Sequence, residues 1–128
     1  MSYSFSKTVD LKFDEAIEKT IAELKKEGFG VLTEIDIKAT LKKKLDVDFR
    51  NYQILGACNP PFAHKALQAE DKIGLMLPCN VIVQETENGK IEVSAINPIA
   101  SMQAVQNDQL SEIAGQVSDK LKRVIESI

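Results

Sequence analysis

The chain has 128 residues, a net charge of -3 and 44% hydrophobic residues, enough for one domain with a real core. The negative charge argues against nucleic acid as a partner, because a basic surface supplies most of the affinity for phosphates. The apolar stretches are far shorter than the roughly 20 residues that cross a bilayer, and the N-terminal residues do not form a secretory signal. We therefore expect a cytoplasmic protein without a membrane partner, and two cysteines that are reduced thiols.

The N-terminal part predicts a strand followed by a long helix. Residues 3–7 alternate between apolar and polar side chains, as a half-buried strand does. From residue 13 to residue 24, apolar side chains recur every three or four positions and form one stripe of an amphipathic helix. Gly28 then suits the end of this helix, because glycine enters the left-handed region at little cost.

Two further strands flank a short helix in the next segment. Residues 30–35 predict a strand, and Asp36 is placed to cap a helix over residues 37–45. Residues 52–58 predict the next strand. Gly56 within it weakens side-chain packing but allows another group to approach the backbone closely.

The middle of the chain predicts a second short helix and a strand that ends at a proline. Asn59 is a candidate N-cap whose side chain accepts a backbone N–H, and Pro60 fits the first helical position. We expect the helix to cover residues 60–70. Residues 73–77 form a short apolar run, which we interpret as a strand that Pro78 interrupts.

The C-terminal part predicts a hairpin and a second long helix. Residues 79–85 and 90–96 read as antiparallel strands, joined at Asn88-Gly89 by a type I′ turn. Residues 99–105 predict an irregular or briefly helical connection, and Asn107 caps the last helix. Its apolar stripe contains Leu110, Ile113, Ala114, Val117, Leu121 and Val124. Two amphipathic helices and a curved, mostly antiparallel sheet would bury each other's apolar faces in a two-layer α+β domain spanning residues 1–128.

Four segments resemble one protein family, domain-of-unknown-function family 302, which consists of small bacterial and archaeal proteins. They are GFGVLTEID at 28–36, GACNP at 56–60, AHKAL at 63–67 and IGLMLPCN at 73–80. The resemblance covers nearly the whole chain. It implies a β-α-β(4)-α, TBP-like fold and a homodimer, and no established activity. Many relatives are expected to have an aromatic residue where this chain has His64.

Two similar Cys-Asn pairs mark a candidate ligand-binding site. Cys58 ends one predicted strand and Cys79 begins another, and an asparagine follows each. A helix that starts after Asn59 would also offer free N–H groups and a positive dipole end to an anion. We expect a small-molecule, anion or partner site at these two turns, with Gly56, Cys58, Asn59, Pro78, Cys79 and Asn80 as its residues.

Other interpretations of the same residues remain open. Thiolate, imidazole and thioether groups suit Zn or Cu, so a soft-metal site is an alternative, with Cys58, His64, Cys79 and Met102 as ligands. Thiol redox chemistry between the two cysteines is another. In a purely structural interpretation the cysteines are apolar filler and the asparagines satisfy turns. The sequence contains no C-x-x-C, G-x-x-x-x-G-K-[ST], G-x-G-x-x-G or H-E-x-x-H motif and no nucleophile elbow, and we favour a binding protein over an enzyme.

Overall fold

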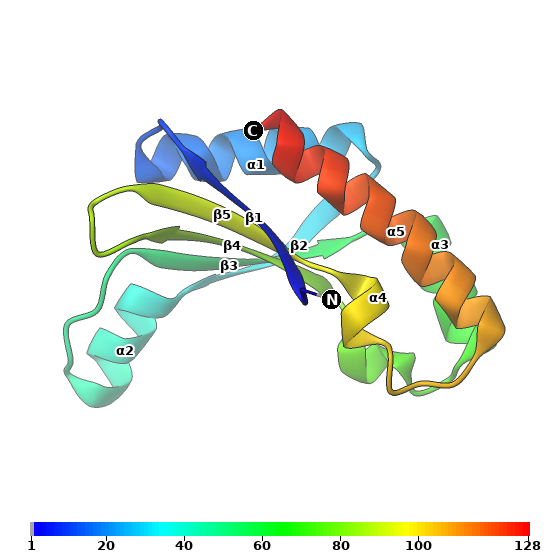
Figure 1. Cartoon of the computed structure of the whole chain (residues 1–128). Helices are drawn as coiled ribbons and strands as arrows, with labels where there is room; N and C mark the ends of the chain where they lie inside the picture. The colour runs from blue at the N-terminus through cyan, green and yellow to red at the C-terminus, as the bar shows by residue number, and fades with distance from the viewer. Residues whose placement is uncertain (1) are drawn as a thin grey trace.

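The computed structural model of the protein describes residues 2–128. In this part of the chain five strands form one antiparallel sheet in the order β1-β5-β4-β3-β2. The strands are β1 (Ser4–Val9), β2 (Gly30–Asp36), β3 (Tyr52–Cys58), β4 (Cys79–Glu85) and β5 (Ile91–Ile96). The long helices α1 (Phe13–Lys26) and α5 (Asp108–Ser127) lie together on one face of the sheet (Figure 1). The predicted two-layer α+β fold is confirmed.

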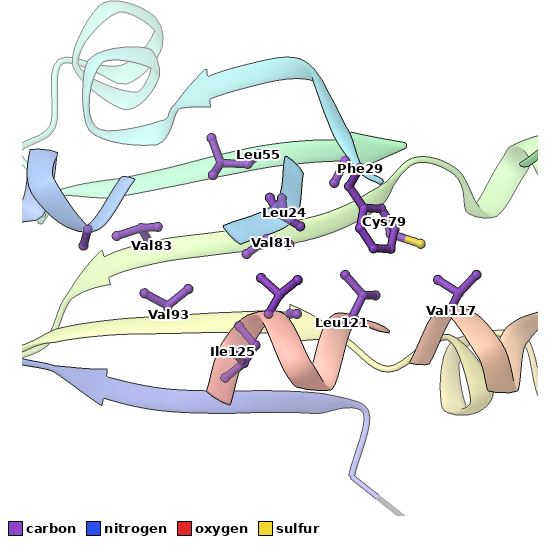
Figure 2. Close-up of a cluster of buried hydrophobic side chains, with 14 of the residues drawn as sticks. Leu24, Phe29, Leu55, Cys79, Val81, Val83, Val93, Val117, Leu121 and Ile125 are labelled. Carbon is purple, nitrogen blue, oxygen red and sulfur yellow. The ribbon is translucent and has the colours of Figure 1, made fainter. Parts of the chain in front are cut away.

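The core lies between this sheet face and the two long helices. Side chains of alternate strand residues point into it, and Figure 2 shows Leu55, Val81, Val83 and Val93 of the strands and Leu121 of α5 within this cluster. All five of these side chains are fully buried. Burial of each such side chain stabilises the folded state by about 1.5–3 kcal/mol, so this aliphatic layer is the main source of stability.

The end of α1 is fixed by the glycine that the sequence pattern singled out. Gly28 has φ +88°, and its N–H donates to the main-chain oxygen of Lys25 at 3.0 Å. The N–H of Phe29 donates to the oxygen of Leu24 at 2.9 Å. These two bonds form a Schellman motif, which ends the helix and turns Phe29 into the core.

The start of α5 is capped by Asn107, as predicted. Its side-chain oxygen accepts hydrogen bonds from the N–H groups of Gln109 and Leu110, at 3.1 and 3.2 Å. Its side-chain nitrogen donates to the main-chain oxygen of Ala69 at 2.8 Å. One residue therefore starts α5 and also holds the end of helix α3 (Pro60–Ala69) beside it.

A second small cluster of buried side chains extends the core beyond the end of the sheet. It lies between α3, the 3-10 helix η1 (Ile73–Met76), α4 (Pro98–Ser101) and the start of α5. Its buried members are Ala66, Ile73, Met102, Leu110 and Ala114. The remaining helix, α2 (Ile37–Leu45), is capped by Asp36 as predicted and contains no buried residue. Within residues 2–128, no helix is long and apolar enough to cross a membrane.

Two local predictions are wrong. Residues 73–77 do not form a strand, because pairing of β4 with β3 begins only at Cys79 and the preceding segment has no strand beside it. Ile73 is instead buried against α3 and α5 through the turn of η1. The hairpin is present, but its turn is not type I′, since Gly89 has φ +73° and Asn88 does not have a positive φ. The loop is longer, with Gly89 donating to Thr86 at 2.9 Å.

Candidate functional site

The two cysteines come from neighbouring strands and meet at one end of the sheet. β3 and β4 pair in antiparallel register, with Ala57 opposite Cys79, so the last residue of β3 and the first residue of β4 lie together. Pro78 precedes Cys79 through a cis peptide bond. Cys58 is half-buried, Cys79 is buried, and both are free thiols. Both cysteines therefore lie at the same end of the sheet, where they line one cavity.

A cavity of about 330 Å³ opens at this end of the sheet. Its walls come from the ends of β3 and β4, the inner side of α3, the segment around η1, the turn after α4 and the first half of α5. Residues of α3 and α5 supply most of the far wall: Phe62, Ala63, Ala66, Leu67, Ile113, Ala114 and Val117. Phe29, Cys79 and Val117 stand where the main core meets the cavity (Figure 2). Residues of both the main core and the second cluster thus line the cavity.

The lining is almost free of polar side chains. Asn59 is the one lining residue with a side-chain nitrogen or oxygen, and no charged residue contributes to the walls. This apolar surrounding changes the pKa of Cys79. Burial is the larger cause and the nearby Cys58 the smaller, and together they raise the pKa of Cys79 to about 11. At neutral pH Cys79 is therefore a neutral thiol, which is a poor nucleophile and a poor metal ligand.

Asn59 stands at the predicted N-cap position, but its side chain does not cap the helix. Its amide nitrogen donates instead to the main-chain oxygen of Glu27 at 3.1 Å. The geometry of α3 explains this difference, because Pro60 and Pro61 have no N–H to donate at the first two helical positions. Phe62 is left as the one capping donor, so this helix start has few of the N–H groups that bind anions. The anion part of the predicted site loses its physical basis.

The other two members of the predicted set lie outside the cavity. Gly56 is buried, but a side chain at this position would collide with Thr33 Oγ1 and would lie 2.8 Å from Cγ of Pro78. The close approach expected at this glycine is therefore made by Thr33 and the proline ring. Asn80 is exposed and pairs opposite Gly56, on the sheet face away from Cys79. The cavity lining thus includes Cys58, Asn59, Pro78 and Cys79 from the predicted set.

The proposed metal ligands do not all come together. Met102 lines the cavity with the two cysteines, whereas His64 is exposed on α3 and does not line it. Across residues 2–128, no three His, Cys, Asp or Glu side chains are grouped so as to hold a metal ion. A closed zinc site requires four ligands in a tetrahedron, and the neutral Cys79 would have to lose its proton first.

Several cavity residues were not identified from the sequence as site residues. Phe29, Phe62, Leu77 and Val117 line the cavity. The signal that was available for Phe29 is its place after Gly28, where a Schellman motif puts an inward-facing apolar residue. Nothing in the apolar stripe of α5 indicates that part of it faces a cavity rather than another side chain.

Comparison with known proteins agrees with this architecture. The family model "Domain of unknown function DUF302" matches residues 5–128. A similar solved structure is that of an uncharacterized conserved DUF302 protein from Bacillus stearothermophilus. It has 29% sequence identity and a TM-score of 0.92, over 99% of this chain and 98% of that chain. No curated protein matches. The chain belongs to the DUF302 family.

Proposed function

We propose that the protein binds a small, mainly apolar molecule in the cavity between the Cys58/Cys79 end of the sheet, α3 and α5. The observation that carries the proposal is the cavity itself, with a volume of about 330 Å³ and walls made almost wholly of apolar side chains. Ligand sites in proteins typically measure roughly 300–1,000 Å³ and combine apolar walls with a few polar groups. This cavity lies at the small end of that range.

Small residues at the walls support a role in binding rather than in packing. Ala63, Ala66 and Ala114 line the cavity from the two helices, and larger side chains there would fill the space. An empty apolar cavity loses the dispersion contacts that close packing provides. A ligand restores these contacts, and burial of its apolar surface contributes roughly 25 cal/mol per Å².

Titration of the ¹⁵N-labelled protein with heptanol, followed by amide chemical shifts, tests the proposal. The expected result is a saturable shift of residues around the cavity, including Ala57, Cys79 and Met102. The variant Ala63→Leu should abolish it, because the added side chain occupies the cavity. Ala69→Leu is the matched control, since Ala69 lies on the same helix but outside the lining.

Absence of saturable shifts in the wild-type protein would reject the proposal and favour the structural interpretation of the two Cys-Asn turns. Equal binding by the wild-type and Ala63→Leu proteins would place the ligand elsewhere on the surface. The metal and redox alternatives have weaker support, because Cys79 keeps its proton at neutral pH and His64 does not line the cavity that the two cysteines share.

A further inference from the structure

The cavity contains one polar side chain with an unused hydrogen-bonding group. Asn59 is only 8% exposed. One N–H of its amide nitrogen donates to the main-chain oxygen of Glu27. Within residues 2–128, no hydrogen bond reaches its side-chain oxygen, Oδ1, and this atom is not sealed from solvent. Asn59 thus offers a single acceptor at a wall that is otherwise apolar.

We infer, building on the proposed function, that the ligand is uncharged and carries one hydrogen-bond donor, such as a hydroxyl or amide N–H, which Asn59 Oδ1 accepts. The remainder of the ligand is apolar and fills the space between Ala63, Met102 and Val117.

The orientation of the Asn59 amide determines which ligand group fits. Because the nitrogen donates to a main-chain oxygen, the amide cannot be turned over without losing that bond. Its oxygen therefore remains an acceptor, and the matching ligand group must be a donor. A ligand without a donor would cover this oxygen and leave it unpaired, which is unfavourable for a buried polar group.

The walls also select against charge. No charged side chain lines the cavity, so a buried ion would lose its hydration without gaining a partner. The raised pKa of Cys79 reports the same property of the site, since burial there disfavours the thiolate. Both carboxylates and ammonium groups should therefore bind poorly.

Two isomeric probes test the donor directly. Heptanol and methyl hexyl ether have the same atoms and nearly the same shape, but only the alcohol has a donor. We expect the wild-type protein to bind the alcohol about threefold to tenfold more tightly, the usual effect of one net hydrogen bond. The side-chain amide signals of Asn59 should shift with the alcohol and not with the ether. Heptanoate and heptylamine, both charged at neutral pH, should bind at least about tenfold more weakly than the alcohol.

Each outcome separates this inference from the proposed function. Equal affinity for the alcohol and the ether would overturn the inference while the cavity remains a ligand site. Tighter binding of either ion would overturn it as well. Failure of both neutral probes to bind would overturn the inference together with the proposed function.

A pair of asparagine variants completes the test. Asn59→Ala should remove the preference for the alcohol, whereas Asn80→Ala, in the other Cys-Asn pair, should retain it because Asn80 does not line the cavity. If Asn59→Ala does not fold, the wild-type protein alone still tests the inference. Its relative affinity for the alcohol and the ether, and the shifts of its Asn59 side-chain signals, show whether Asn59 accepts a hydrogen bond from the ligand. A preference that persists in folded Asn59→Ala would overturn the inference.

Discussion

The side-chain amide of Asn59 donates a hydrogen bond to the main-chain oxygen of Glu27 at 3.1 Å, and so connects the start of α3 to the end of α1. Glu27 is the C-cap of α1 and has few other ways to satisfy its carbonyl oxygen. The bond lies beside the cavity, because Asn59 lines it. Phe29, which follows Glu27 by two positions, and Phe62, which follows Asn59 by three, line it as well. The first Cys-Asn pair therefore has a structural role that the second does not share.

Replacement of Asn59 should destabilise the protein far more than replacement of Asn80. Asn59→Ala removes a donor from a partly buried main-chain oxygen, which costs about 1–3 kcal/mol of the free energy of unfolding. Asn80 is exposed, so Asn80→Ala should change it by less than about 0.5 kcal/mol. Urea unfolding measures both variants. Equal losses would show that the link to Glu27 contributes nothing particular.

Gly56→Ala should be destabilising because the added methyl group has no room. It would collide with Thr33 Oγ1 and lie 2.8 Å from Pro78 Cγ. We expect a loss of about 1–3 kcal/mol in the free energy of unfolding, as for other overpacked sites. Gly30→Ala is the matched control, since a methyl group there meets no atom within 4 Å.

Thr33→Ala should reduce the cost of Gly56→Ala, because it removes the closest obstacle. A double-mutant cycle measures this coupling. A cost that is the same in both backgrounds would mean that the collision with Thr33 is relieved by backbone movement.

Stability should fall in alkaline solution through the titration of Cys79. The folded protein keeps this thiol proton up to a pKa of about 11, whereas the unfolded chain releases it at the model value of 9.0. Between these two values the folded state binds more protons, so the free energy of unfolding decreases as pH rises and levels off above about 11. The expected loss is on the order of 2 kcal/mol.

The Cys79→Ala variant isolates this effect from the titration of lysine and tyrosine. Unfolding measured at about pH 8.5 and about pH 10.5 should show a larger decrease for the wild-type protein than for the variant. The same pH dependence in both proteins would argue against a buried, proton-retaining Cys79.

The homodimer implied by the family resemblance stays a prediction. Sedimentation equilibrium should give twice the mass of one chain at micromolar concentration. The mass of a single chain would contradict it.

Much of the fold follows from local patterns in the sequence. The stripes of α1 and α5, the glycine after α1 and the Asn107 cap are each set by periodicity or by a few neighbouring residues, and the structure contains all of them. Residues 73–77 show where this fails. A short apolar run fits a strand or a buried turn equally well. Whether residues 73–77 have a neighbouring strand depends on where β3 ends, and the run itself does not encode this.

The site was only partly predictable for a similar reason. The two thiols were expected together because each stands at a strand end, and the pairing of β3 with β4 brings them there. The partner of Asn59 was not foreseeable, because Glu27 lies in a distant part of the chain and reaches it through the turn at Gly28. The cavity itself depends on the distance between α3 and α5, which no local pattern encodes.

Nuclear Overhauser contacts between bound heptanol and the methyl groups of the protein test the central claim most directly. We predict contacts to Met102, Leu77 and Val117, which line the cavity from three different segments, and their loss in Ala63→Leu. Contacts confined to exposed apolar residues such as Leu75 and Leu45, or contacts that persist in Ala63→Leu, would contradict a ligand site in this cavity.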